Sequence, residues 1–173
     1  MSEKTKPCVR LIYAATIDRV IGSKGKLPFH LPGDLKRFQQ MTMGGVLVMG
    51  SATHFSIPAK KRPLKGRTNV VLTRDSTLKL HGVIMAHSLN SIRADYSDKD
   101  IWIIGGGEVL KQAILFADRI HLTLVHNEIV GDTLSPIIDP VIWREESKSE
   151  IITEGTVKYQ YIDYIRKDPS TKS

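Results

Sequence analysis

Residues 101–110 read Ile-Trp-Ile-Ile-Gly-Gly-Gly-Glu-Val-Leu, an apolar run of strand length that ends in three glycines and opens into a helical pattern. This order favours an anion site, because the first N–H groups of a helix lack partners and glycines let a phosphate approach the main chain closely. A dinucleotide fits that description. Leu110, however, occupies the third glycine position of the usual Gly-x-Gly-x-x-Gly pattern, and an ordinary strand-to-helix turn also tolerates glycines. Both interpretations of the segment stay open.

Apolar runs of strand length alternate with helical patterns on both sides of this segment. Strands are expected at 10–17, 46–49, 69–73, 82–86, 101–104 and 120–125. Helices are expected at 34–43, 53–57 and 88–96, and after the three glycines. The last third has strand-like composition at 150–153 and 157–166, which suggests an antiparallel pair. These units predict a single-domain α/β fold with a mostly parallel central sheet, an antiparallel C-terminal edge and flanking helices.

The length of 173 residues, with 41% hydrophobic and 25% charged residues, is that of one domain able to enclose a sheet and a ligand cleft. We expect a domain over 1–167 and a disordered tail over 168–173. The N-terminus carries charges without a following secretory apolar region, and the longest apolar stretches are strand-length. Neither export nor membrane spanning is therefore indicated, and the expected compartment is the cytoplasm. The single cysteine, Cys8, excludes an intramolecular disulfide.

The net charge of +7 raises the question of a nucleic-acid partner. The densest basic stretch, 60–67, reads Lys-Lys-Arg-Pro-Leu-Lys-Gly-Arg, and its proline and glycine indicate a loop and not a groove-reading helix. Aromatic residues are few, and no nucleic-acid motif is present. A basic surface also attracts small anions, and a plain solvated loop is the simplest interpretation. We therefore expect no nucleic-acid partner.

A single carboxylate, Asp34, stands in the run Leu-Pro-Phe-His-Leu-Pro-Gly-Asp-Leu over residues 27–35. From Asp34 onward the pattern is helical, and at about 100° per residue Asp34 shares an arc with Leu35 and Phe38. The acid therefore lies on the apolar face of the predicted helix, where a charge meant only for solvation is unexpected. The alternative is an N-cap or first-turn residue that satisfies the free amides of the helix start.

The sequence motifs of metal sites and of two common classes of hydrolase are absent from the chain. The six histidines show no metal-ligand spacing with cysteine and no His-Glu-x-x-His arrangement, so no metal site is expected. The chain also lacks the Gly-x-Ser-x-Gly elbow of many hydrolases and the Gly-x-x-x-x-Gly-Lys-Ser/Thr loop of nucleotide hydrolases. A lone acid in an apolar cleft beside a dinucleotide-like site remains.

Six short motifs follow one another along nearly the whole chain. They are Ile-Asp-Arg-Val-Ile-Gly at 17–22, Leu-Pro-Phe-His-Leu-Pro-Gly-Asp-Leu-Lys-Arg-Phe at 27–38, Val-Met-Gly at 48–50, Arg-Pro-Leu-Lys-Gly-Arg-Thr-Asn at 62–69, Ile-Gly-Gly-Gly-Glu at 104–108 and Gly-Asp-Thr at 131–133. In this order and spacing the sequence resembles bacterial-type dihydrofolate reductases, from about Val9 to Arg166. The resemblance implies the single-domain fold of that family.

The resemblance further implies hydride transfer from NADPH to the pteridine ring of 7,8-dihydrofolate, which gives 5,6,7,8-tetrahydrofolate. In the family the acid matched by Asp34 binds the amino group and a ring N–H of the pterin and favours protonation of the imine nitrogen through water. Thr123 matches the threonine that hydrogen-bonds this carboxylate. Phe29 matches a catalytic position where tryptophan is usual, so the indole N–H that would hold an ordered water is absent. Burial should raise the pKa of Asp34.

The implied substrate pocket is lined by apolar side chains, each of which is equally compatible with plain core. These residues are Ile12, Leu35, Phe38, Ile57 and Leu64. Arg67 is implied to clamp the glutamate α-carboxylate of the substrate with its planar guanidinium.

The implied cofactor is NADPH, with NADH left open. The residues implied to bind it are Ala14, Ile21, Gly22, Gly50, Ser51, Thr53, Leu72, Thr73, Arg74, Ile104, Gly105, Gly106, Gly107, Glu108, Val109 and Leu110. In this family the Gly105–Gly106 peptide is expected to be cis. Residues 22–27 resemble a mobile loop that closes over the nicotinamide, and Asp132 resembles the residue that holds it closed. Ser51 and Ala52 stand where basic residues commonly grip the 2′-phosphate, which leaves Arg74 as the best remaining clamp.

Other functions of the same fold stay open at this point. One is a pyrimidine or pterin reductase related to the reductase domain of riboflavin biosynthesis, against which the proline-bracketed Asp34 argues. Another is a non-catalytic folate- or nucleotide-binding protein, or a basic RNA-binding protein, which would keep the pocket and lose the hydride geometry. We expect a monomer whose partner is the small-molecule substrate, because no exposed apolar stripe is evident in the sequence.

Overall fold

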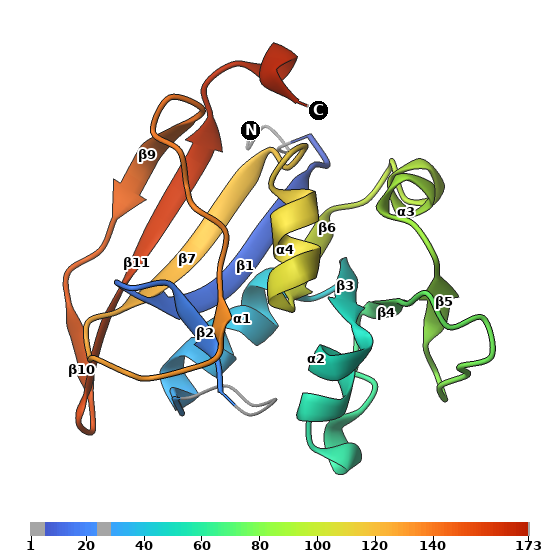
Figure 1. Ribbon diagram of the computed structural model, residues 1–173, viewed down its shortest axis with the longest axis horizontal. Coiled ribbons are helices and arrows are strands. Elements are labelled where there is room, and N and C mark those ends of the chain that lie inside the picture. The colour runs from blue at the N-terminus through green and yellow to red at the C-terminus, as the bar shows by residue number, and fades with distance from the viewer. Residues whose placement is uncertain (1–5, 24–28, 173) are drawn as a thin grey trace.

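A nine-stranded sheet forms the centre of the computed structural model, which describes residues 6–23 and 29–172. Six of its strands are parallel and lie in the order β7-β1-β6-β3-β4-β5 (Figure 1). They are β1 (Val9–Thr16), β3 (Val46–Gly50), β4 (Thr68–Leu72), β5 (Ile84–Ala86), β6 (Ile101–Gly105) and β7 (Arg119–Val125). The predicted mostly parallel central sheet is therefore confirmed.

The C-terminal edge of the sheet is antiparallel, as expected, but it has one strand more than the sequence indicated. The long strand β11 (Val157–Arg166) pairs with β7 on one side and with both β9 (Trp143–Lys148) and β10 (Ile152–Glu154) on the other. β9 escaped prediction because its sequence after Trp143 is Arg-Glu-Glu-Ser-Lys, all exposed, so it has no apolar alternation. A separate two-stranded sheet joins β2 (Val20–Gly22) to β8 (Thr133–Leu134).

Helices cover both faces of the sheet. They are α1 (Pro32–Thr42), α2 (Ser51–Ser56), α3 (Leu89–Asp95) and α4 (Gly107–Ala113), with 3-10 turns η1 (Ala59–Lys61) and η2 (Pro169–Thr171). Successive residues of β1 point to opposite faces. Leu11 packs in a cluster with Val109 and Leu110 of α4, whereas Ile12 packs in a second cluster with Phe38 of α1. The sheet thus has two apolar faces, one under α4 and one under α1 (Figure 1).

The helix after the glycines is shorter than its apolar spacing predicted, since α4 ends at Ala113 and the chain turns before β7. The expected helix cap is confirmed at Ser88, whose hydroxyl accepts a hydrogen bond from the Ser91 N–H at 3.1 Å. No helix within the described ranges is long and apolar enough to cross a membrane.

The end of the chain, expected as a disordered tail over 168–173, contains the turn η2 as far as the structure describes it. Asp168 caps this turn, and Lys172 pairs with Asp118 at the start of β7. Residue 173 lies outside the described residues.

Arg166 links this end of the chain to the sheet and to the segment after α4. The side chain is 7% exposed and stacks 4.8 Å from the Trp143 ring centroid. Its guanidinium donates to the carbonyl oxygens of Ile114 and Ala117, each at 2.8 Å, and to the Thr171 hydroxyl at 2.9 Å. One cation therefore satisfies two carbonyls that the end of the helix leaves free.

We expect Arg166→Met to lower the free energy of unfolding by about 3 kcal/mol, because two buried carbonyls lose a charged donor while the apolar stem is kept. Urea unfolding followed by circular dichroism measures this loss. Arg144→Gln on the exposed side of β9 is the matched control, with an effect within about 0.5 kcal/mol. Equal effects of the two substitutions would contradict the assigned role.

Candidate active site

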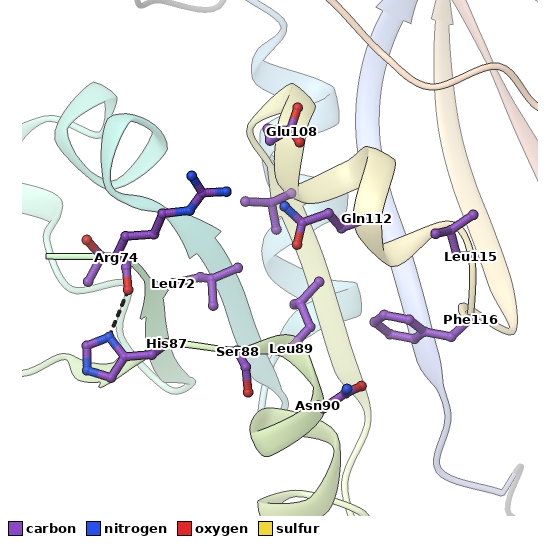
Figure 2. Close-up of a pocket in the computed structure, with 12 residues that line it drawn as sticks. Leu72, Arg74, His87, Ser88, Leu89, Asn90, Glu108, Gln112, Leu115 and Phe116 are labelled. Carbon is purple, nitrogen blue, oxygen red and sulfur yellow. Dashed lines mark hydrogen bonds between the residues drawn. The ribbon is translucent and has the colours of Figure 1, made fainter. Parts of the chain in front are cut away.

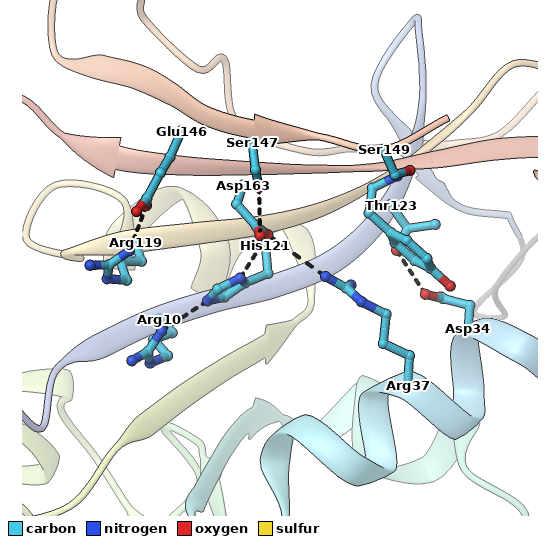
Figure 3. A network of polar contacts seen from close by, with 11 residues as sticks. Arg10, Asp34, Arg37, Arg119, His121, Thr123, Glu146, Ser147, Ser149 and Asp163 are labelled. Carbon is cyan, nitrogen blue, oxygen red and sulfur yellow. Dashed lines mark hydrogen bonds and ion pairs between the residues drawn. The ribbon is translucent and has the colours of Figure 1, made fainter. Parts of the chain in front are cut away.

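Asp34 lies in the first turn of α1, and its carboxylate reaches across to the sheet. The Thr123 hydroxyl on β7 donates to Asp34 Oδ1 at 2.8 Å, and Thr123 is only 3% exposed. The N-cap of α1 is Leu31, and no side-chain cap hydrogen bond is made there. Asp34 is therefore a first-turn residue and not the N-cap, and its carboxylate points toward Thr123 on β7 (Figure 3).

The start of α1 is capped by a residue from the far end of the chain. Pro32 occupies the first helical position, where its missing N–H costs nothing. The next free donor, the Gly33 N–H, is accepted by the Glu154 carboxylate, with distances of 2.8 and 3.2 Å to its two oxygens. A Cβ at Gly33 would lie 3.1 Å from both Glu154 Oε1 and the Tyr159 hydroxyl oxygen. The absent side chain thus lets β10 and β11 approach the helix that carries Asp34.

The surroundings of Asp34 act on its charge in opposite directions. Burial is the largest influence and raises the pKa of Asp34 above its ordinary value. The Thr123 hydrogen bond and the positive charge of Arg37 lower this pKa, while the negative charge of Glu154 raises it. The result is a carboxyl with a raised pKa that can take up a proton more readily than a surface aspartate.

An apolar cluster lies beside Asp34 under α1. It brings together four of the residues expected in a substrate pocket, namely Ile12, Phe38, Ile57 and Leu64. Arg67 lies at its edge with its guanidinium 5.9 Å from the Phe38 ring centroid, and it donates to the Thr42 hydroxyl at 3.2 Å. Burial lowers the pKa of Arg67. Leu35 is outside the cluster and 48% exposed, so it is free to contact a ligand in the cleft.

The three glycines form a junction with too little space for side chains. The Gly105–Gly106 peptide is cis, as expected, and Gly105 has a φ of 147°. A Cβ at Gly105 would lie 3.2 Å from the Thr53 hydroxyl oxygen, and one at Gly50 would lie 3.4 Å from Val109. Thr53, Gly50 and the glycines therefore meet at the ends of β3 and β6, where the main chain is bare.

A groove of about 870 Å³ runs from this region between β4, α3 and α4 (Figure 2). Its lining includes Leu72, Thr73 and Arg74 on one side and Glu108 and Val109 on the other. Figure 2 shows the Arg74 side chain extended toward the α4 side. His87 makes a 2.9 Å hydrogen bond from Nδ1 to the carbonyl oxygen of Thr73. The groove is thus long, open and provided with one exposed cation.

The remaining cofactor positions differ in how they relate to this groove. Leu110 is 1% exposed, packs in the core on the sheet side of α4 and does not line the groove, so its expected contact with the cofactor stays a prediction. Ile104 belongs to the cluster under α1. A Cβ on Gly107 would lie 3.5 Å from Ile21, which joins β2 to the glycine junction. Ala14 pairs in register with Thr123, next to Asp34.

Ser51 and Gly22, which are also expected to bind the cofactor, each lie at the end of a helix or strand. Ser51 begins α2 directly after Gly50. Gly22 ends β2, and its carbonyl accepts from the Asp132 N–H at 3.0 Å, which ties the start of the expected loop to the segment before β8. Residues 24–27 of that loop lie outside the described residues.

Phe29 belongs to an apolar cluster separate from the one under α1. It packs with Leu31, Val125 and Tyr159. It also lines a second hollow of about 480 Å³, together with Glu154 and the turn that follows it. A ring without a polar atom therefore occupies this wall of the cleft.

Sequence reasoning missed Glu154 and Arg37 as neighbours of the acid. Glu154 is 120 residues distant from Asp34 in the sequence and stands in a strand with no distinctive pattern. Arg37 lies outside the arc that Asp34 shares with Leu35 and Phe38, so the helical pattern places it on the polar side of the predicted helix. The spacing of three residues between Asp34 and Arg37 on a helix is a local signal that could have indicated their contact. Glu154 leaves no such signal, because its contact depends on how β10 packs against α1. Within the described part of the chain, no three His, Cys, Asp or Glu side chains gather as a metal site requires.

Comparison with known proteins matches residues 8–166 to the dihydrofolate reductase family. The dihydrofolate reductase of Mycobacterium tuberculosis is 37% identical over 161 residues, covering 91% of this chain and 98% of that protein. The one from Haemophilus influenzae is 42% identical over 137 residues, covering 79% and 83%. A solved dihydrofolate reductase from Enterococcus faecalis, complexed with NADP(H) and RAB-propyl, has a TM-score of 0.84 and 35% identity, covering 93% and 97%. The family match includes every site residue described above.

We expect Glu154→Ala to lower the free energy of unfolding by about 1 kcal/mol, because the Gly33 N–H loses its acceptor. The same substitution lowers the pKa of Asp34, since a nearby negative charge is removed. Urea unfolding and a ¹³C-carboxyl NMR titration measure the two effects. Glu150→Ala, an exposed acid just before the same hairpin, is the control and should change neither quantity. A cap role is wrong if both variants lose the same stability.

Proposed function

This chain belongs to the dihydrofolate reductase family, and we propose that Asp34 is the residue with which it binds the pterin ring and assists its protonation. As a member of the family, it is an oxidoreductase that reduces 7,8-dihydrofolate to 5,6,7,8-tetrahydrofolate with NADPH. One observation carries the proposed role of Asp34. It is the only acid that reaches into the cleft from α1 among the described residues, and a buried threonine holds its carboxylate.

The reaction needs a hydride and a proton on adjacent atoms of the pterin. The bound NADPH supplies the hydride. Asp34 accepts hydrogen bonds from the amino group and a ring N–H of the pterin, which leaves the imine nitrogen to take its proton through water. A carboxylate beside the ring stabilises the positive charge that this protonation creates. Thr123 orients the carboxylate through its hydroxyl, because it donates to one oxygen and leaves the other free.

The apolar cluster under α1 is the proposed pocket for the flat parts of the substrate. Ile12 and Phe38 contribute apolar surface near Asp34, and Ile57 and Leu64 extend it toward Arg67. Arg67 binds the α-carboxylate of the glutamate tail, since a guanidinium matches a carboxylate with two parallel hydrogen bonds. Leu35 covers the ligand from the exposed side of α1. Phe29 closes the far wall without supplying a donor, so the water that delivers the proton is held by other groups.

The groove and the glycine junction fit a dinucleotide. Bare backbone at Gly105 and Gly106 beside the Thr53 hydroxyl supports binding of the pyrophosphate. The groove lined by Leu72, Thr73 and Val109 extends from there and has space for the adenosine half. Arg74 binds the 2′-phosphate, a role supported by its exposed guanidinium in the groove and by the absence of a cation at Ser51 and Ala52. Ala14, Ile21 and Gly22 lie on the nicotinamide side.

The enzyme is proposed to act as a monomer in the cytoplasm. One chain supplies every element of the site, because Asp34, Thr123, the apolar cluster and the groove all come from the same domain. No partner subunit is needed to complete it.

We expect Asp34→Asn to reduce kcat/KM for dihydrofolate by at least about 100-fold, because the carboxylate is lost while its size and its contact with Thr123 are kept. The measurement is the loss of reduced-nicotinamide absorbance. NADPH binding, followed by fluorescence, should stay unchanged. A variant that keeps full turnover would contradict the role of Asp34, and a wild-type protein that binds a pterin analogue without turnover would indicate a non-catalytic binder.

The same substitution should not destabilise the fold at neutral pH. The pKa of Asp34 is raised in the folded state, so its stabilising contribution is present below its unfolded-state pKa and is lost as pH rises through the folded-state pKa. Asp34→Asn removes this penalty, and its melting temperature at pH 8 should equal or exceed that of the wild type. The difference between the two proteins should shrink or reverse as the pH falls.

Arg74→Gln should raise the KM for NADPH about tenfold or more and leave the KM for NADH unchanged, because only NADPH carries the 2′-phosphate. Parallel assays with both cofactors measure this. Lys79→Gln is the matched control, since Lys79 is an exposed cation of the same loop that does not line the groove. Equal losses with both cofactors would overturn the assignment of Arg74.

A further inference from the structure

A chain of charged and polar side chains crosses the sheet beside Asp34 (Figure 3). Arg10 on β1 contacts His121 on β7, with 3.1 Å between Arg10 Nη1 and His121 Nε2. His121 Nδ1 lies 2.9 Å from Asp163 Oδ1 on β11. Asp163 Oδ1 lies 3.7 Å from Arg37 Nη2 on α1. The chain thus connects three neighbouring strands to the helix that carries Asp34.

The contact with Arg10 determines which ring nitrogen of His121 carries the proton. A guanidinium only donates hydrogen bonds, so His121 Nε2 must accept. The remaining nitrogen, Nδ1, therefore carries the proton and donates to Asp163. The Ser147 hydroxyl donates to the other oxygen of Asp163 at 3.0 Å. The pKa of Asp163 is lowered, first by the hydrogen bond from His121. Asp163 is thus a fixed anion with one oxygen facing Arg37.

Arg37 is held by two residues on the same face of β11. Its guanidinium carbon lies 3.8 Å from the ring centroid of Tyr161 and its Nη2 faces Asp163. It follows Asp34 by three residues on α1, so both side chains face the sheet from adjacent turns. Besides the cap that Glu154 supplies at Gly33, α1 is therefore attached to the sheet by the contact of Asp34 with Thr123 and by that of Arg37 with β11.

Five groups face Asp34 from the elements around it. They are Arg37 on α1, Glu154 on β10, Tyr159 and Tyr161 on β11, and Thr123 on β7. Burial raises the pKa of both tyrosines, so their phenols are neutral. Arg37 is the cation of this set, and Glu154 is the opposing anion.

We propose that Arg37 is a positioning residue for Asp34, and that the Arg10–His121–Asp163 chain acts on catalysis by holding Arg37 in place. This inference rests on the proposed role of Asp34. The contact of Arg37 with Asp163 is long, at 3.7 Å, and partly exposed to solvent, so it adds little to stability. This contact instead fixes the position of the Arg37 guanidinium and the way in which α1 packs against the sheet.

The direction in which the pKa of Asp34 shifts in Asp163→Asn distinguishes this proposal from a simple effect of the lost charge. Asp163→Asn removes a negative charge from the neighbourhood of Asp34, and by charge alone this would lower the pKa of Asp34. If Asp163 acts by holding Arg37, its loss lets the cation move away and the pKa of Asp34 rises instead. A ¹³C-carboxyl NMR titration of the free protein measures this without any turnover.

The expected result is an upward shift of the Asp34 titration in both Asp163→Asn and Arg37→Gln. The double variant should shift no further than Arg37→Gln alone, because Asp163 then has nothing to hold. The pH profile of kcat/KM for dihydrofolate should move in the same direction, with a loss on the order of tenfold at neutral pH. Arg37→Lys, which keeps the charge, should restore the titration in large part.

Glu146→Gln is the matched control. It removes one negative charge from β9 and breaks the 2.6 Å contact of Glu146 with Arg119, and neither of these two residues is among the groups that shift the pKa of Asp34. It should leave the titration and the pH profile unchanged. A downward shift, or none, in Asp163→Asn would overturn the inference. If the wild type titrates as expected but does not reduce dihydrofolate, the proposed role of Asp34 fails while the holding of Arg37 stands.

Discussion

The hydrogen bond from Thr123 to Asp34 is the contact on which the site depends, because it joins the helix with the acid to the central strand β7 at the cleft. Its position follows from the fold. Thr123 is paired in register with Ala14 on β1 and with Tyr161 on β11, so three strands fix its hydroxyl. A loosely held carboxylate in a cleft could turn toward water, whereas this one keeps one oxygen bound and presents the other to a ligand.

The parallel sheet explains why the apolar cluster and the glycine junction lie near each other. Ligands of open α/β sheets bind at the carboxyl ends of the strands, and here β3 ends at Gly50, β4 at Leu72 and β6 at Gly105. The groove proposed for the cofactor begins at Leu72 and passes Val109, which lies beside Gly50. The acid comes to the same edge from the other face, on α1. The proposed sites for the two ligands therefore lie where the two apolar faces of the sheet meet its edge.

Charged residues that lie beside Asp34 change its pKa. Glu154 caps the helix and adds a negative charge, while Arg37 in the next turn adds a positive one. Each is held by β10 or β11, the antiparallel edge. The edge strands are thus part of the active-site environment, although none of their side chains was expected to contribute. Asp34 lowers the stability of the folded protein when it is ionised, because a buried carboxyl with a raised pKa costs free energy in its charged form.

The family, the parallel sheet, the acid at residue 34 and the glycine junction can all be recognised in the amino-acid sequence alone. These depend on local patterns, such as apolar runs, prolines around residue 34 and three consecutive glycines, which are read along the chain. The tertiary structure decided what surrounds them. Glu154 caps α1, and Arg37 is held by Asp163, each through contacts between residues distant in sequence. Such contacts leave no periodic signal, because a single polar residue on a strand reads the same whether it faces water or a helix.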